Sequence, residues 1–158
     1  MKELITLVSL FPKKTDEIAS EVCEKLNKFL LNAADLVDYE VSNQNEMEKT
    51  CGKQYLDKCI NRVLLSITEY ENAIISMDYS LLFRPKILER FKERTNIVFI
   101  KLSKGSDALL PKDEAAFEER QQRLINNSKL IIDVEKMDKQ DVASLVVKQI
   151  MPLISTEV

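Results

Sequence analysis

A few acidic and basic side chains in this 158-residue chain are spaced so that they could bind a ligand. Asp38 and Glu40 are two carboxylates two positions apart, which could hold a magnesium ion and a substrate hydroxyl. Arg120 could hold the carboxylate of an acid through paired hydrogen bonds. Lys13 and Lys14 are adjacent, and their two positive charges could attract an anion.

Each of these candidates also has an ordinary structural interpretation. Carboxylates at the end of a strand are also ordinary loop residues, and two adjacent lysines are typical of a solvated surface. Arg120 follows two glutamates, which are ordinary neighbours on a helix surface. Asp78, which follows an apolar run, is typical of a turn. Residue types alone therefore leave both interpretations open.

Several kinds of chemistry are excluded by what the chain lacks. It has no histidine, so a Ser–His–Asp or Cys–His nucleophile and a His-ligated metal are impossible. Its two glycines, Gly52 and Gly105, cannot build a glycine-rich phosphate loop. The net charge of −3 argues against a nucleic-acid partner. Cys23, Cys51 and Cys59 lack a C-x-x-C spacing, which favours reduced thiols over a disulfide framework or a zinc site.

Composition indicates one globular domain. Hydrophobic residues make up 45% and charged residues 31% of the chain, and no apolar run approaches the roughly 20 residues of a membrane span. The first residues lack the features of a signal peptide. We therefore expect a cytoplasmic protein without a membrane partner, folded as a single domain over residues 1–158 with a frayed tail at 155–158.

Five short apolar runs predict buried strands, and amphipathic segments separate them. The runs cover residues 4–8, 35–38, 73–77, 96–102 and 129–133. Strands that alternate with helices imply right-handed crossovers and a parallel sheet between two helix layers. The predicted fold class is therefore α/β, a single three-layer α/β/α domain with a five-stranded parallel sheet.

Helical spacing and end signals predict the intervening helices. We expect Thr15 to be the N-cap of the first helix, with Asp16 and Glu17 in its first turn. Its apolar face is expected to extend to Phe29. We expect four later helices. The first covers residues 56–67, the second carries Pro85 in its first turn, the third begins near Pro111 and the fourth begins at Asp138.

In this order the elements resemble shikimate kinase, a small member of the P-loop nucleoside-monophosphate-kinase-like fold. The segment LVSLFPKKTDE at residues 7–17 occupies the place of the family's G-x-x-x-x-G-K-[ST] loop. Asp38-Tyr39-Glu40 resembles its D-x-D segment, and IISMD at 74–78 resembles its third strand. RQQRLINNS at 120–128 resembles its R-x-x-x-Y-x-x-x-A run. The resemblance covers residues 4–150 and implies the strand order 2-3-1-4-5.

The resemblance also implies a site. The family's arginine at the position of Arg120 holds the shikimate carboxylate, so Arg120, Asp38, Glu40 and Asp78 are the expected substrate-binding residues. We expect no metal site and no catalytic residue, because the phosphate-loop position departs from the family pattern.

The departures fall on the parts that bind nucleotide. Both motif glycines are absent, Thr15 stands where the lysine should be, and Asp16 stands at the Ser/Thr position that holds magnesium. Lys13 and Lys14 are basic, but at a shifted register. We interpret Lys13, Lys14, Thr15 and Asp16 as a degenerate phosphate-loop position.

Three functions remain open at this point. The favoured one is a shikimate-kinase-like protein that neither binds ATP normally nor transfers phosphate, and that binds a small hydroxy acid or a partner protein without a cofactor. The alternative is an active small-molecule phosphotransferase that uses ATP and magnesium through Lys13 and Lys14. A receiver-like signalling domain fits Asp78, Ser103 and Lys104 superficially, but no acidic pair follows the first strand.

Overall fold

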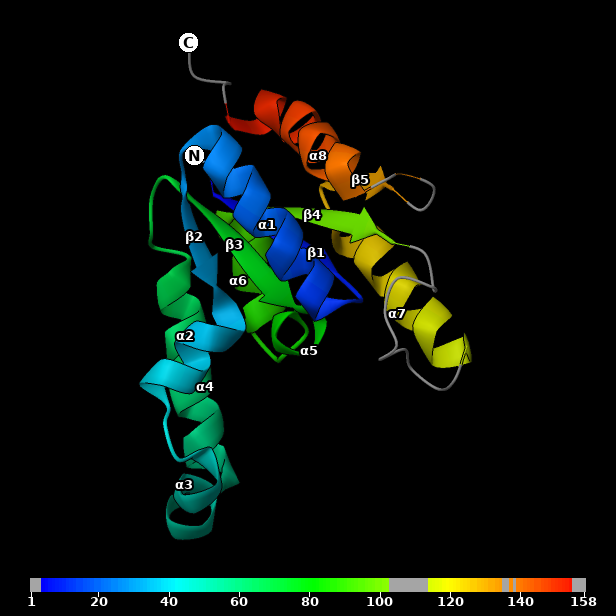
Figure 1. The fold of residues 1–158 in the computed structure, drawn as a ribbon. Helices are drawn as coiled ribbons and strands as arrows, with labels where there is room; N and C mark the ends of the chain where they lie inside the picture. Colours follow the sequence, from blue (N-terminus) through cyan, green and yellow to red (C-terminus); the bar gives the residue numbers. More distant parts are fainter. Residues whose placement is uncertain (1–3, 103–113, 135–136, 138, 155–158) are drawn as a thin grey trace.

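The computed structural model describes residues 4–102, 114–134, 137 and 139–154 (Figure 1). In these residues five strands form one parallel sheet of order β2-β3-β1-β4-β5. The first strand is therefore central, and the predicted fold class and strand order are confirmed. The strands are β1 (Ile5–Ser9), β2 (Phe29–Asn32), β3 (Ala73–Asp78), β4 (Asn96–Lys101) and β5 (Leu130–Asp133).

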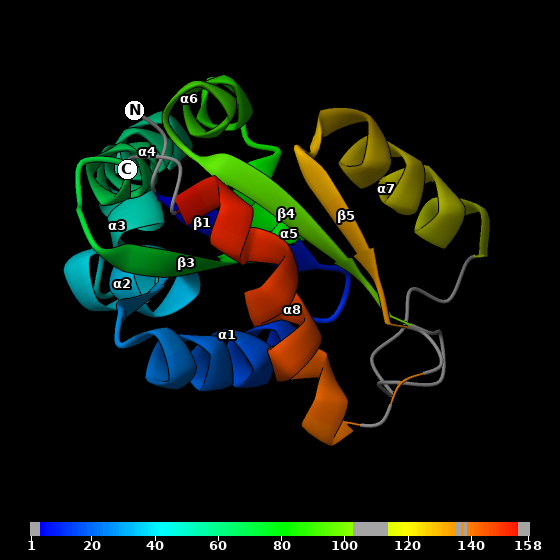
Figure 2. The same cartoon turned by 90° about the horizontal axis from the view of Figure 1, so that it is seen from above.

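Helices cover both faces of the sheet (Figure 2). Helices α1 and α8 pack on one face, and α2, α4 and α6 pack on the other. None of the helices in the described part of the chain is long and apolar enough to span a membrane. The helices are α1 (Pro12–Leu26), α2 (Ala33–Glu40), α3 (Gln44–Cys51), α4 (Lys53–Ile67), α5 (Tyr79–Leu82), α6 (Ile87–Arg94), α7 (Glu114–Asn127) and α8 (Lys139–Ile154).

The strands divide their side chains between two hydrophobic clusters. Ile5 and Leu7 of β1 pack with α1 and α8, whereas Val8 packs on the opposite face. Ile74 and Ile75 of β3 divide in the same way. This alternation follows from the two-residue period of a strand. Both faces of the central strands are buried, which is why their sequences are nearly continuous apolar runs.

The predicted strand at 35–38 is wrong, because these residues lie in α2 and the second strand is Phe29–Asn32. Asn27 has the left-handed backbone conformation (φ 54°) that ends α1, so the chain can turn into β2. Asn32 then caps α2 by accepting a hydrogen bond from the Asp35 amide. Phe29 consequently lies on an edge strand, 70% exposed, and not on the apolar face of α1.

The first helix begins earlier than predicted. Pro12, not Asp16, occupies its first turn, because proline fits a position where no amide hydrogen is needed. Thr15 is fully buried inside the helix and is not its N-cap. Asp16 and Glu17 accordingly lie beyond the first turn.

Other boundaries shift or lie outside the described residues. Pro85 precedes α6 and does not lie in its first turn. The helix α3 was not predicted; none of its residues is buried, and together with the start of α4 it projects from the body of the molecule (Figure 1). The predicted helix starts at Pro111 and Asp138 and the frayed tail at 155–158 lie outside the described residues.

Candidate functional site

A two-residue turn, Leu10 and Phe11, connects β1 to α1 at the carboxyl edge of the sheet. The Phe11 amide donates to the Ser9 hydroxyl at 3.0 Å. The Ser9 and Thr15 hydroxyls share a hydrogen bond of 2.6 Å. The Thr15 amide and hydroxyl both donate to the Phe11 carbonyl, at 3.0 and 3.2 Å. The polar groups of Ser9, Phe11 and Thr15 named here therefore bond to one another, and all three residues are buried.

An aromatic pair lies beside this turn. Phe11 is 2% exposed, and its ring lies 6.1 Å from the ring of Phe117 on α7. Phe117 is also buried. Helix α7 is thus anchored to the β1–α1 turn by apolar contact at the carboxyl edge of the sheet, where ligands bind in open α/β sheets.

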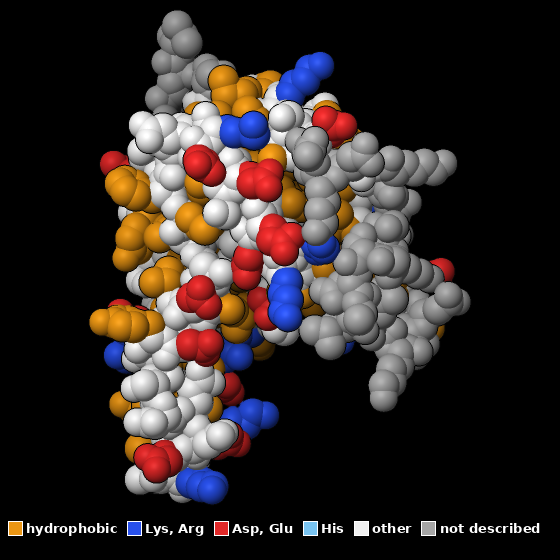
Figure 3. All heavy atoms as spheres, in the orientation of Figure 1, with side chains coloured by type: hydrophobic (Ala, Val, Ile, Leu, Met, Phe, Trp, Pro, Cys, Tyr) orange, Lys and Arg blue, Asp and Glu red, His pale blue; other side chains and the backbone are white. Residues whose placement is uncertain are grey.

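The charged residues that follow the turn differ in exposure and in bonding partners. Lys13 is exposed, and Lys14 forms an ion pair with Glu17 at 3.7 Å. The Asp16 carboxylate accepts a hydrogen bond from the Ser76 hydroxyl of β3. Acidic side chains also gather over α1 and α2 on the face seen in Figure 3. The surroundings of the α1 N-terminus are therefore of mixed charge.

A second group of side chains joins α5 to α7. Asp78 ends β3 and caps α5 by accepting from the Ser80 amide at 3.2 Å. Tyr79 follows Asp78 in the sequence, and the guanidinium carbon of Arg120 lies 5.3 Å from the centre of its ring. Asp78 and the Arg120 guanidinium therefore both lie beside Tyr79, at the end of the sheet where β3 finishes.

Sequence reasoning missed three residues of this group. Arg123 has its guanidinium carbon 5.5 Å from the ring centre of Phe83 and donates to the Tyr79 hydroxyl at 3.4 Å. That hydrogen bond raises the pKa of the Arg123 guanidinium. The rings of Tyr79 and Phe83 lie 4.5 Å apart. The three-residue spacing of Arg120 and Arg123 on one helix was the available signal, because such residues share a helix face.

Asp38 and Glu40 lie elsewhere. Both are exposed on α2, and the Asp38 carboxylate accepts a hydrogen bond of 3.4 Å from Gln44. The premise that they follow a strand is wrong, because residues 35–38 are helical. Figures 1 and 2 place α2 and α7 on opposite sides of the molecule, so these carboxylates do not meet Arg120. Their role in ligand binding stays a prediction.

The cysteines and carboxylates form no metal cluster in the described part of the chain. Cys23 is buried on α1, as its apolar spacing predicted, and desolvation raises the pKa of its thiol to about 11. Cys51 is exposed on α3, and Cys59 is half-buried.

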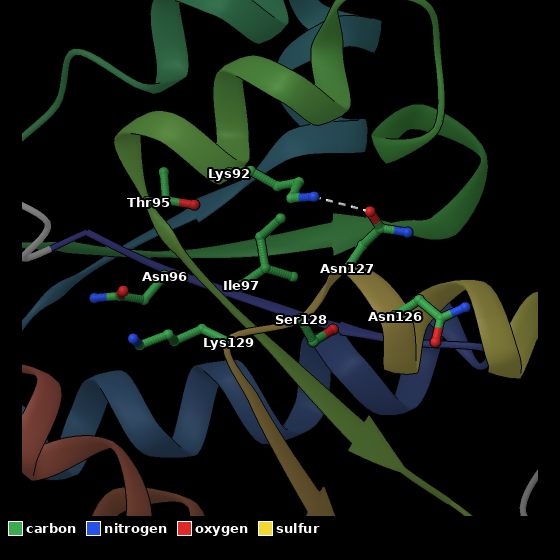
Figure 4. Close-up of a pocket in the computed structure, with 8 residues that line it drawn as sticks. All are labelled: Lys92, Thr95, Asn96, Ile97, Asn126, Asn127, Ser128 and Lys129. Atoms are coloured by element: carbon green, nitrogen blue, oxygen red, sulfur yellow. Dashed lines mark hydrogen bonds between the residues drawn. The ribbon is translucent and has the colours of Figure 1, made fainter.

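A polar pocket of about 200 Å³ lies at the opposite, amino edge of the sheet (Figure 4). Its side chains largely bond to helix ends: Thr95 donates to the Phe91 carbonyl of α6, and Asn127 and Ser128 donate to carbonyls of the last turn of α7. Lys92 reaches across the pocket to the Asn127 side chain at 3.1 Å. These groups satisfy the carbonyls that end two helices.

Comparison with solved structures identifies the fold. Shikimate kinase from Aquifex aeolicus matches with a TM-score of 0.72 and 21% identity, over 95% of this chain and 97% of that chain. Shikimate kinase from Acinetobacter baumannii, solved with shikimate, matches with a TM-score of 0.74 and 12% identity, over 97% and 95%. Dephospho-CoA kinase from Campylobacter jejuni matches with a TM-score of 0.66 and 13% identity, over the full length of both chains. No family model and no curated protein matches this sequence.

The fold is that of the P-loop kinases, a parallel sheet of order 2-3-1-4-5 between helix layers. Among these folds the chain resembles that of shikimate kinase over nearly its whole length, as the order of its elements predicted. Sequence identities this low establish the fold, and fold alone does not define an activity.

Proposed function

We propose that this chain is a shikimate-kinase-like protein that works by binding and does not transfer phosphate from ATP. The observation that carries the proposal is the closed β1–α1 turn. A phosphate loop needs several free backbone amides around a hollow the size of a phosphate group, followed by a lysine and a magnesium-binding hydroxyl. Here the connection has two residues, and the Phe11 amide is bonded to Ser9.

The residues of this segment do not fit a magnesium-bound triphosphate. Pro12 at the first position of α1 has no amide hydrogen to donate. Thr15, at the position of the motif lysine, is buried with its hydroxyl engaged by Ser9 and Phe11. Asp16 adds a negative charge where the triphosphate would lie. Phosphoryl transfer depends on positioning and charge stabilisation, so loss of the cradle, the lysine and the hydroxyl together removes its main contributions.

The ligand that we propose is a small hydroxy acid, or an acidic group on a partner protein, held at the carboxyl edge near Asp78 and Arg120. Arg120 supports this because it is exposed and its guanidinium lies over the ring of Tyr79, the residue that follows Asp78. Asp38 and Glu40 lie on α2, on the other side of the molecule, so any ligand that they bind is separate from the one that Arg120 holds.

The alternative is an active kinase with a non-standard loop. It is favoured by the likeness to several solved kinases and by Lys13, which is exposed in the first turn of α1. Calorimetry with ATP–magnesium and an assay of shikimate phosphorylation distinguish the two functions. Our proposal predicts no turnover above that of a Lys13→Ala/Lys14→Ala variant. Turnover that this double substitution abolishes would establish the alternative.

A further inference from the structure

We propose that Arg120 and Arg123 together form a binding site for a small, doubly charged oxyanion, with Tyr79 and Phe83 as the aromatic base that holds both guanidinium groups. The inference rests on the proposed function for the location of the ligand at the carboxyl edge of the sheet. To that proposed function the inference adds Arg123 as a second binding residue and a double negative charge on the ligand. The resemblance to shikimate kinase implies neither of these.

The two arginines converge on one tyrosine. The Arg120 guanidinium lies over the Tyr79 ring, and Arg123 donates to the hydroxyl of the same residue. Arg123 also lies over Phe83, whose ring is 4.5 Å from that of Tyr79. Tyr79 begins α5 and Phe83 directly follows that helix, whereas both arginines lie on α7, about forty residues further along the chain. The fold therefore places two positive charges beside one aromatic surface.

This arrangement suits oxyanion binding because both guanidiniums remain accessible. Arg120 and Arg123 are exposed, and no carboxylate in the described part of the chain forms an ion pair with either of them. A guanidinium that lies over an aromatic face keeps its N–H groups at its rim for in-plane hydrogen bonds to a carboxylate or phosphate. The ring contacts also restrict both long side chains before a ligand binds, which lowers the entropy lost on binding.

Nearby acids limit what can bind. The Asp78 carboxylate is engaged in capping α5. Glu119 attracts Arg123 electrostatically from the same helix, although the two form no ion pair. A ligand must therefore bring enough negative charge to compete with Glu119 for Arg123. A ligand with two negative charges can pair with both guanidiniums, whereas a monocarboxylate can satisfy only one.

Calorimetry of the full chain at constant ionic strength tests this proposal. The probes are succinate for dicarboxylates, inorganic phosphate for phosphate monoesters, and acetate as the singly charged reference. We expect succinate or phosphate to bind more tightly than acetate, and the more tightly bound of the two identifies the chemistry of the ligand. Arg123→Gln should weaken that binding by about tenfold to a hundredfold, the range for hydrogen bonds to charged groups, and should leave acetate nearly unaffected.

The matched control is Arg94→Gln, which removes an exposed arginine from the end of α6. It should leave binding unchanged, and the melting temperature of each variant shows that it is folded. The proposal would be overturned if neither succinate nor phosphate bound more tightly than acetate. It would also be overturned if Arg94→Gln and Arg123→Gln weakened the binding of the dianion equally. Those results would leave the proposed loss of ATP binding intact. That loss is tested separately through Lys13 and Lys14, which lie on a different helix from the arginine pair.

Discussion

The hydroxyl of Ser9 is the centre of the closed turn, so Ser9→Ala should destabilise the protein measurably. The side chain is fully buried, and its oxygen is the acceptor for the Phe11 amide. Alanine would leave this buried donor without a partner, which costs about 1–3 kcal/mol. The free energy of unfolding should fall by that amount, and the melting temperature by about 2–4 °C for each kcal/mol.

A second substitution distinguishes the loss of these hydrogen bonds from a general loss of packing. Thr15→Val should cost less than Ser9→Ala, because the Phe11 carbonyl keeps its hydrogen bond from the backbone amide of residue 15. The double variant should cost less than the sum of the single variants, since both remove the Ser9–Thr15 hydrogen bond.

Urea unfolding followed by circular dichroism measures these differences, and Ser20→Ala on the exposed side of α1 is the control. The control should change stability by no more than about 0.5 kcal/mol. If Ser9→Ala costs no more than Ser20→Ala, the turn is not held together by these hydrogen bonds. The reasoning from a closed turn to absent phosphate binding would then fail.

Three further predictions concern other parts of the molecule. Cys51 is exposed and should react with a thiol reagent at pH 8 while the buried Cys23 stays protected, as mass spectrometry can show. Because burial raises the pKa of the Cys23 thiol from 9.0 to about 11, its contribution to the free energy of unfolding should be complete below pH 9.0 and be lost as the pH rises through about 11, as urea unfolding over this pH range can show. Arg84→Ala should cost about 1–2 kcal/mol in urea unfolding, because its guanidinium donates at 3.0 and 2.9 Å to two side chains of α4, and an equal cost for Arg94→Ala would contradict this. Asp78→Ala should cost about 1 kcal/mol through loss of the α5 cap, whereas Asp78→Asn, which keeps an acceptor oxygen, should retain most of the stability.

The sheet could be predicted from sequence because its strands are continuous apolar runs separated by amphipathic helices. Residues 73–77 and 96–102 are unambiguous in this sense, and the structure places β3 and β4 there. The edge strand was missed because Phe29 and Leu30 also continue the helical spacing of α1. Asn27 and Asn32 were the signals that should have decided it, since one ends a helix and the other begins one.

The arginine–aromatic group could be predicted only in part. Arg120 was identified through a sequence resemblance, but its neighbours Tyr79 and Phe83 lie about forty residues away in sequence. Local spacing cannot show that α5 and α7 meet, because that contact depends on the crossing of β3, β4 and their helices. In the same way, Phe11 could be recognised as apolar, but its pairing with Phe117 required the fold.

Calorimetric titration with ATP–magnesium tests the central claim most directly, provided that anion binding at the arginine pair is removed. The titration should therefore use the Arg120→Gln/Arg123→Gln variant beside the unaltered chain, with magnesium tripolyphosphate as the reference without adenosine. Our account predicts that ATP binds no more tightly than tripolyphosphate to the unaltered chain, and that the double variant binds neither. Micromolar binding of ATP to the double variant, lost on Lys13→Ala/Lys14→Ala substitution, would contradict it.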